Sequence, residues 1–411
     1  MINNRILFIF TVVPYPVRAN GVSIRYFPLI QFLARRYDID IILLANENSS
    51  QEDIKELKRY CNNFFFLQDP KYRKHGFFET WSTKVNFFVP WTPPISLVVD
   101  GGRDIVREIS KFVRDTPYGA IVWVGSYLCP YLFPLIKSLP VSRIVVDFID
   151  SPTLWQQRRL DRSLGLSSFQ SYECWKTMRW EAMVIRTVSE SIYISEVDAA
   201  SVPLRLTPGR SRRVIPNGIS MDSYSTDRVA SIPRPNIGFL GNMGYFPNVE
   251  AVLWLYKEVF CPLRITYPSL SLLIIGRDPV PSIRELEADP GVIVTGAVES
   301  VWKYINSVDI FAFPLWIGGG LKNKVLEAMY AGRPVVTTPI GNEGIDAVPG
   351  REILINSDRS GFIDALEMLL QSESERIRVG EAAHRYVTGK FSWTNILSRF
   401  EEAFIGNVQE Q

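Results

Sequence analysis

A lysine and a glutamate stand three residues apart in a segment with helical periodicity, Lys322 to Tyr330, which follows a run of glycines that starts at Gly318. The first turn of a helix leaves backbone N–H groups unpaired, and the macrodipole adds about half a positive charge there. Such a loop is therefore a predicted phosphate site. Lys324 on the first turn could neutralise a diphosphate, and Glu327 could accept paired hydrogen bonds from sugar hydroxyls.

The same spacing also fits a simpler role. Side chains three residues apart on a helix are neighbours, about 5–6 Å apart at Cβ, so Lys324 and Glu327 could form an exposed ion pair of little energetic weight. Beside a phosphate site, the lysine and the carboxylate suit a nucleotide sugar instead. The spacing alone fits both interpretations.

The segments that position this pair alternate between strands and helices. A short apolar run ends at Pro314 before the glycines, and Pro334 begins the β-branched segment PVVTT after the helix. The same alternation begins at Arg5 and continues through both halves of the chain, whose 411 residues are too many for one ordinary domain. Two doubly wound α/β domains are therefore predicted.

Composition narrows the classes of function. Hydrophobic residues make up 46% and charged residues 21% of the chain, which are globular values, and a formal charge of +2 gives no case for a nucleic-acid partner. Scattered cysteines and two histidines form no convincing metal site, and no apolar run is long enough for a membrane helix. No G-x-G-x-x-G segment follows the first strand, which argues against a dehydrogenase.

Four blocks in the C-terminal half, IGFLGNMGYFPN, LLIIGRDP, VTGAV and GGGLKNKVLEAM, resemble in their order the donor-site signature of the GT-B retaining glycosyltransferases of family 4. They look most like the sugar transferases of bacterial exopolysaccharide systems. In that family a Lys-x-x-Glu pair follows the glycine loop, and its glutamate is the second of two. Glu327 matches this second glutamate, whereas Gly319 stands at the position of the first.

The resemblance implies the GT-B fold, in which two Rossmann-like domains face each other across a cleft. The segment from Val214 to Ile219 resembles the crossing between them. We therefore expect an acceptor-binding domain at residues 1–210, a nucleotide-sugar donor domain at 211–388, and a closing helix at 389–411 that packs on the first domain.

The resemblance also implies which residues bind the donor. The family's second block often carries a cation after its glycine, but the segment from Gly244 to Asn248 has none, so Lys324 and Arg277 would carry more of the diphosphate charge. A glycine loop near the first strand usually faces the donor, and Gly21 is its best match, although it could be a plain turn glycine. The expected donor-binding residues are Gly21, Gly241, Asn242, Arg277, Val298, Gly318, Gly319, Gly320, Leu321, Lys324 and Glu327.

Asp150 follows the predicted strand from Arg143 to Ile149 and is the third candidate catalytic residue, beside Lys324 and Glu327. Ligands of open α/β sheets bind outside the carboxyl ends of strands. Many family members have a histidine on this side of the cleft, and this chain has none at a comparable strand end. Asp150 could touch the sugar or the acceptor, or else Asp150 or Ser151 could cap the next helix.

Three further segments carry expectations. Cations and aromatic residues interleave from Lys71 to Trp91, which suits either peripheral membrane contact or a loop packed on its own domain. The helical pattern from Trp155 to Arg186 is rich in arginine and tryptophan and predicts a solvated helix face. A helix followed by a short strand near Ala199 to Val202 is predicted within Glu190 to Pro203.

Together these features predict an enzyme, a glycosyltransferase of hexosyltransferase type (EC 2.4) acting in polysaccharide or glycoconjugate biosynthesis. It would move a sugar from a nucleoside diphosphate sugar, a co-substrate, to a saccharide or lipid-linked acceptor. No D-x-D motif stands where a metal could bridge the phosphates, so independence from divalent metal is expected, with no metal site and no cofactor. The expected location is the cytoplasm, with peripheral contact at the inner face of the plasma membrane. A nucleotide-sugar epimerase and a catalytically silent GT-B subunit are the alternatives.

Overall fold

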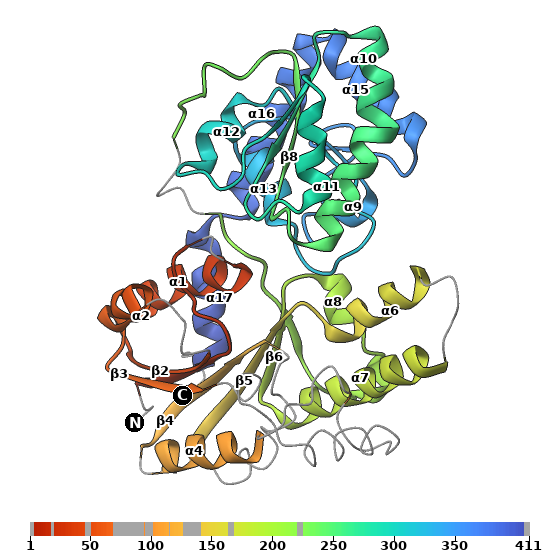
Figure 1. Cartoon of the computed structure of the whole chain (residues 1–411). Helices are drawn as coiled ribbons and strands as arrows, with labels where there is room; N and C mark the ends of the chain where they lie inside the picture. Colours follow the sequence, from red (N-terminus) through yellow and green to blue (C-terminus); the bar gives the residue numbers. More distant parts are fainter. Residues whose placement is uncertain are drawn as a thin grey trace. The chain divides into compact units, whose positions relative to one another are not determined.

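The computed structural model describes residues 4–17, 20–45, 51–68, 94, 102–114, 116–125, 141–162, 168–219 and 225–406. The chain divides into two compact units, an N-terminal unit of Met1–Asn217 with Ile396–Gln411 and a C-terminal unit of Gly218–Asn395. The expected boundaries after residues 210 and 388 lie slightly before these divisions. Each unit is built around one sheet that is covered by helices (Figure 1).

The N-terminal unit holds a sheet with the strand order β3-β2-β1-β4-β5-β6-β7. Every pairing between neighbouring strands is parallel. Its strands are β1 Arg5–Phe10, β2 Asp38–Ala45, β3 Asn63–Gln68, β4 Tyr118–Val124, β5 Val141–Ile149, β6 Glu190–Tyr193 and β7 Arg212–Val214. The described helices are α1 Gly21–Leu33, α2 Gln51–Leu57, α4 Gly102–Arg114, α6 Pro152–Arg162, α7 Ser168–Thr187, α8 Glu196–Ala200 and α17 Trp393–Ile405.

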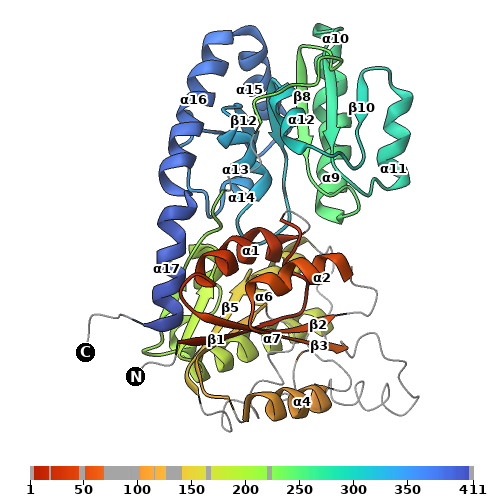
Figure 2. The same ribbon diagram turned by 90° about the vertical axis from the view of Figure 1, so that its left-hand side faces the viewer.

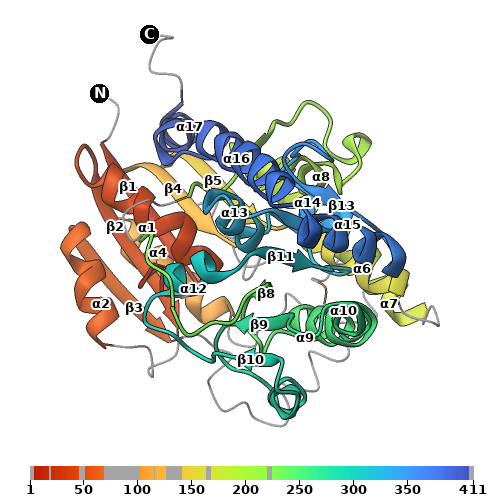
Figure 3. The ribbon, with the colours of Figure 1, turned by 90° about the horizontal axis from the view of Figure 1, so that it is seen from above.

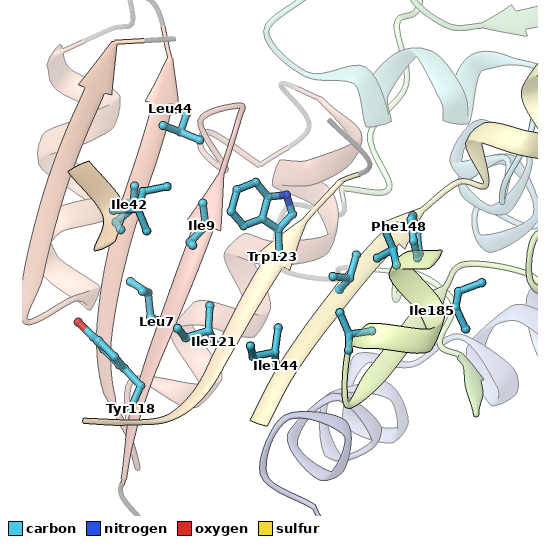
Figure 4. Close-up of a cluster of buried hydrophobic side chains, with 14 of the residues drawn as sticks. Leu7, Ile9, Ile42, Leu44, Tyr118, Ile121, Trp123, Ile144, Phe148 and Ile185 are labelled. Atoms are coloured by element: carbon cyan, nitrogen blue, oxygen red, sulfur yellow. The ribbon is translucent and has the colours of Figure 1, made fainter. Parts of the chain in front are cut away.

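Strand β1 shows how this sheet is buried on both faces. Side chains alternate across a strand, and Leu7 and Ile9 belong to a hydrophobic cluster that α4 and α7 also supply (Figure 4). On the opposite face, the Phe8 ring lies 5.7 Å from that of Phe404 in α17, and the Phe10 ring lies 5.2 Å from that of Tyr26 in α1. Helix α17 therefore packs beside β1 and α1, as Figure 2 shows.

The C-terminal unit holds a parallel sheet with the order β10-β9-β8-β11-β12-β13. Its strands are β8 Asn236–Leu240, β9 Ser271–Ile275, β10 Val292–Val294, β11 Ile310–Phe313, β12 Val335–Thr337 and β13 Leu354–Ile355. Its helices include α9 Phe246–Trp254, α10 Cys261–Thr266, α11 Pro281–Arg284, α12 Val301–Ser307, α13 Asn323–Tyr330, α14 Pro339–Asn342, α15 Arg359–Gln371 and α16 Glu373–Lys390. Figures 1 and 3 show α9 and α10 on one face of the sheet and α12, α13 and α16 on the other.

Two expected elements differ from the structure. The strand predicted near Ala199 to Val202 is wrong, because β6 comes first and is followed by α8, which contains Ala199. The Ser195 side chain accepts a hydrogen bond from the backbone N–H of Asp198 and so caps α8. The expected solvated helix from Trp155 to Arg186 is two helices, α6 and α7, and α7 buries much of its surface, including Trp180.

No helix in the described ranges is both long and apolar enough to cross a bilayer. The interleaved cations and aromatic residues from Lys71 to Trp91 lie outside the described residues. The membrane contact predicted for that stretch therefore stays a prediction.

Candidate functional site

The predicted glycine loops meet at the point where the strand order of the C-terminal sheet reverses. Strand β8 pairs with β9 on one side and with β11 on the other, where Ile310 lies opposite Ile237. In open α/β sheets, ligands bind outside the carboxyl ends of the strands at this switch point. The loop after β8 leads into α9, and the loop after β11 leads into α13. Both loops therefore lie at the carboxyl ends of these two adjacent strands.

The loop after β8 is tightly packed around two glycines. A Cβ atom on Gly241 would lie 2.7 Å from the side-chain nitrogen of Asn248, and a Cβ atom on Gly276 would overlap the carbonyl oxygen of Gly241. Gly276 also has φ +149°, which L side chains rarely adopt. Asn242, an expected donor-binding residue, accepts a hydrogen bond from the backbone N–H of Gly244 at 2.7 Å and donates one to Asp278 at 3.1 Å. The Asn242 side chain therefore holds the turn.

The loop after β11 is shaped by Lys322, a residue whose role could not be predicted from spacing in the sequence. Gly318 and Gly320 have φ values of +129° and +67°. The Nζ of Lys322 donates hydrogen bonds to the carbonyl oxygens of Gly319 and Gly320, at 2.6 and 2.7 Å, and the residue is only 9% exposed. In a trans peptide the N–H points opposite to the C=O, so the N–H groups of Gly320 and Leu321 point away from this ammonium. A buried lysine thus turns two N–H groups of the glycine loop outward from itself.

Lys324 connects this loop to the helix after β8. Its Nζ donates a hydrogen bond to Oδ1 of Asn248 in α9 and lies 5.3 Å from the ring centroid of Phe239 in β8. Asn248 in turn donates from Nδ2 to the carbonyl oxygen of Asn242 at 2.8 Å. Burial, and then the positive charge of Lys322, lower the pKa of Lys324 to about 7. Two neighbouring cations at the switch point form a site that a bound anion would stabilise.

Glu327 lies one turn beyond Lys324 on α13. That helix begins after Lys322 without a side-chain cap on its first turn, and its Val325, Leu326, Ala328, Met329 and Tyr330 are buried. Lys324 and Glu327 are both partly buried, so they are not the exposed ion pair that the spacing alone also allowed. The pair stands on the helix whose N-terminus borders the glycine loop.

Arg277 and Val298 follow the next two strands. The backbone N–H of Met243 donates to the carbonyl oxygen of Arg277 at 2.8 Å, which ties the loop after β9 to the loop after β8. The Arg277 side chain is 50% exposed and its Nε lies 3.4 Å from the carboxylate of Asp278. Gly276 also forms an isolated bridge with Gly296, two residues before Val298. Backbone contacts therefore link the three loops that hold Gly241, Arg277 and Val298.

The remaining predicted residues, Gly21 and Asp150, belong to the N-terminal unit. Gly21 is the first residue of α1, which Asn20 caps. A Cβ atom on Gly21 would meet nothing within 4 Å, and neither packing nor φ requires a glycine there. The absence of a side chain leaves open space over the start of α1.

Asp150 is exposed directly after β5, where Ile149 adopts a φ of +63°. Ser151 accepts a hydrogen bond from the backbone N–H of Leu154 at 3.2 Å and therefore caps α6. Asp147, three residues earlier, is fully buried and accepts hydrogen bonds from protein groups. Asp150 is thus the carboxylate of this segment that faces solvent.

No group of three or more His, Cys, Asp or Glu side chains that could hold a metal ion is found within the described part of the chain. The expected independence from divalent metal stays a prediction, because it concerns turnover.

Known proteins resemble both the sequence and the structure. The family model described as glycosyl transferases group 1 matches residues 234–372, within the C-terminal unit. The capsular polysaccharide biosynthesis glycosyltransferase CapM of Staphylococcus aureus is 23% identical over 91% of this chain and 92% of its own length. An uncharacterized glycosyltransferase of Methanocaldococcus jannaschii is 23% identical over 40% of this chain, which spans only 44% of that relative.

Two solved structures show the same fold over nearly the whole chain. A sucrose-phosphate synthase from Thermosynechococcus elongatus superposes with a TM-score of 0.71 at 14% identity, over 97% of this chain and 98% of its own. HepE from Anabaena, in complex with UDP and glucose, superposes with a TM-score of 0.64 at 12% identity, over the same shares of the two chains. Both units of this chain therefore have counterparts in these proteins.

Proposed function

Since this chain is a glycosyltransferase with the GT-B fold whose C-terminal unit carries a group 1 domain, we propose that it transfers a sugar from a nucleoside diphosphate sugar to an acceptor hydroxyl. We further propose retention at the anomeric carbon and a saccharide or lipid-linked acceptor in polysaccharide or glycoconjugate synthesis. The likeness to a capsular polysaccharide biosynthesis glycosyltransferase of Staphylococcus aureus, and to HepE, which binds UDP and glucose, supports this proposal.

One observation carries the donor assignment. Lys324 lies at the switch point of the C-terminal sheet. Beside it, the carbonyl oxygens of the glycine loop accept hydrogen bonds from Lys322. Two lysines and outward-directed N–H groups favour an anion with several oxygens. A diphosphate fits that chemistry, and its binding would favour the charged form of Lys324.

In the proposed reaction, the bond between the anomeric carbon and the diphosphate oxygen breaks. The acceptor hydroxyl oxygen bonds to the anomeric carbon, and the acceptor proton leaves with the nucleoside diphosphate. Negative charge grows on the leaving diphosphate, so Lys324 and the amides from Gly319 to Leu321 would stabilise the transition state. Arg277 would add positive charge from the neighbouring loop, which is tied to the loop after β8.

The carboxylates would act on hydroxyl groups. We propose that Glu327 accepts hydrogen bonds from the ribose of the donor, because a carboxylate can accept two such bonds at once. Val298 would contribute backbone contacts to the nucleobase, and Gly21 would let the donor approach the start of α1. Asp150, exposed at the end of β5, would contact the sugar or the acceptor.

Thermal shift with UDP, GDP, ADP and their sugars tests the donor site. A ligand present at about 100 times its dissociation constant adds roughly 2.7 kcal/mol of stability. We expect one nucleotide to raise the melting temperature of the wild type, and Lys324→Ala and Glu327→Ala to lose most of that rise. Lys257→Ala is the matched control, because Lys257 lies in the same unit and its side chain is 82% exposed.

The outcomes separate the proposal from its alternatives. If no nucleotide shifts the wild type, or if Lys257→Ala loses as much of the shift as Lys324→Ala, the donor assignment is wrong. Conversion of a donor sugar without any acceptor would indicate an epimerase. Binding of the nucleotide without transfer or hydrolysis would indicate a silent subunit of an assembly complex.

We also propose that turnover requires no divalent metal, since the lysines supply the positive charge at the diphosphate site. Full activity in excess chelator supports this proposal, and its loss with recovery on adding magnesium would contradict it. The proposed location is the cytoplasm with peripheral contact at the inner face of the plasma membrane. Cell fractionation that recovers the protein outside the membrane and cytoplasmic fractions would contradict that location.

A further inference from the structure

A cavity of about 510 Å³ lies against α7 in the N-terminal unit. Side chains of α7 from Trp175 to Arg186 line it together with Arg205 and Leu206, which belong to the 3-10 turn Leu204–Leu206. Cavities of about 300–1,000 Å³ are large enough for small organic ligands. None of the residues assigned to the donor site is among its described lining residues, so the cavity is distinct from that site.

Positive charge dominates this cavity. Its described lining includes the four cations Lys176, Arg179, Arg186 and Arg205, and no acidic residue. The Lys176 residue is only 1% exposed, and burial lowers the pKa of its ammonium, which Glu173 on the same helix partly offsets. The Arg179 guanidinium lies 4.8 Å from the ring centroid of Trp175. Several cations held near one cavity favour an anionic ligand.

The rest of the described lining is apolar, namely Trp175, Met178, Trp180, Ala182, Met183 and Leu206. Residues seven apart on a helix share one side, so Phe169, Lys176 and Met183 form a stripe along α7. Phe169 is 51% exposed and Met183 is 36% exposed. Exposed apolar side chains therefore lie on this side of α7 both before and after Lys176.

This combination selects one class of ligand. A neutral sugar is recognised through both donors and acceptors, but the described lining contains no Asn, Gln, Ser, Thr, Tyr, Asp or Glu side chain. A free phosphate would use the cations but not the Trp and Met walls. A molecule that has both an anionic headgroup and an apolar chain uses every described part of the cavity.

We propose that this cavity binds an anionic membrane phospholipid, with the phosphate among Lys176, Arg179 and Arg205 and an acyl chain against Trp175 and Met183. Arg186 lies at the same cavity and adds to its positive charge. The proposal does not rest on the donor site in the other unit. It places α7 at the surface of an anionic membrane.

Sedimentation of the full-length protein with vesicles tests the proposal. We expect binding to vesicles of phosphatidylcholine mixed with phosphatidylglycerol and little binding to pure phosphatidylcholine. Each basic residue near an anionic membrane contributes about 1 kcal/mol, which is about fivefold in affinity, so Arg179→Glu with Arg205→Glu should weaken binding by at least about 25-fold. Arg35→Glu is the matched control, because Arg35 is an exposed arginine of the same unit outside the cavity.

A second measurement separates the cavity from a merely basic surface. Monomeric dihexanoylphosphatidylglycerol should raise the melting temperature of the wild type, and glycerol phosphate at the same concentration should not. If the double variant does not fold, Met183→Glu tests the same site, because it adds a negative charge beside the apolar wall. Equal shifts with glycerol phosphate or with an oligonucleotide, no binding to anionic vesicles, or an equal loss in Arg35→Glu would each overturn the proposal.

Discussion

In each unit the strand order reverses at the first strand, because β1 lies between β2 and β4 in one sheet and β8 lies between β9 and β11 in the other. The two units place charge near this point in different ways. In the N-terminal unit, fully buried Arg25 donates from Nε to the carboxylate of Asp147 at 2.7 Å, and Tyr26 donates to the same carboxylate at 2.7 Å. Arg25 also donates to the carbonyl oxygen of Ile215 and to Asn217.

In the C-terminal unit, the groups near the switch point are two neighbouring lysines. Lys322 is satisfied by loop carbonyl oxygens and Lys324 by the neutral amide of Asn248. These partners accept hydrogen bonds without cancelling the positive charge. The two sheets therefore share a topology, but the groups near their switch points differ. The N-terminal unit buries an ion pair, whereas in the C-terminal unit the two lysines donate to carbonyl and amide oxygens at the site where we propose that a diphosphate binds.

The largest effect is expected from a substitution that breaks the N-terminal ion pair. Asp147→Asn keeps the shape of the side chain but leaves the buried Arg25 guanidinium without its counter-charge. Removing one partner of a buried pair costs about 3–5 kcal/mol, so the free energy of unfolding by urea should fall by that amount.

The matched control for this substitution is Glu381→Gln. Glu381 pairs with Arg385 on α16, and the two side chains are 62% and 70% exposed. Exposed pairs contribute about 0–1 kcal/mol. If Asp147→Asn lowers stability no more than this control, the N-terminal pair does not hold the fold, and the contrast between the units is lost.

Lys322→Met should weaken the C-terminal site through the glycine loop. The change leaves the carbonyl oxygens of Gly319 and Gly320 without their donor, which is expected to weaken nucleotide binding about 10- to 100-fold. It also removes the positive neighbour of Lys324, so the pKa of Lys324 should rise. Isothermal titration of the nucleotide measures the first effect, with Lys257→Met as the control of equal charge change.

The pKa of Lys324 separates a positioning role from general destabilisation in this variant. Loss of affinity together with an unchanged pKa for Lys324 would mean that Lys322 supports the loop without acting on its neighbour. Nuclear magnetic resonance of lysine side chains in the wild type and in Lys322→Met measures that pKa directly.

Donor binding should be linked to proton uptake by Lys324. Its pKa of about 7 in the free protein lies below the usual 10.5, so near pH 8 the amine is mostly neutral, and a diphosphate would draw a proton onto it. Affinity for a nucleotide sugar should therefore be constant below pH 7 and fall as the pH rises above 7. Titration at pH 8 in buffers with different ionisation heats should report uptake approaching about one proton. Equal uptake in Lys324→Ala would show that another group takes up the proton.

The smallest expected effect concerns Gly21. Alanine is preferred over glycine within helices by about 0.5–1 kcal/mol, and a Cβ atom at Gly21 meets nothing within 4 Å. Gly21→Ala should therefore leave the free energy of unfolding unchanged or slightly higher while raising the KM for the donor several-fold. Gly389→Ala in α16 is the control, because a Cβ atom there also meets nothing within 4 Å. An unchanged KM in Gly21→Ala would show that Gly21 is not part of the donor site.

Local sequence determined much of the C-terminal site. The helix predicted from Lys322 to Tyr330 is found at Asn323–Tyr330, and the β-branched segment that begins at Pro334 contains strand β12, Val335–Thr337. Such segments follow from periodicity and from glycines that end helices and form turns, which are properties of neighbouring residues. The predicted fold of two parallel α/β domains is confirmed for the same reason, since strands and helices alternate along the chain.

Only the tertiary structure decided which residues meet. Lys324 and Asn248 are 76 residues apart, and they are brought together by the adjacency of β8 and β11, which no local pattern specifies. The role of Lys322 depends on the direction of two peptide groups in a glycine loop, and glycine allows several directions. The cavity beside α7 is formed where the turn Leu204–Leu206, beyond β6 and α8, packs against that helix. Hydrogen-bond partners and burial are set by contacts between distant segments, so periodicity and spacing in the sequence could not predict them.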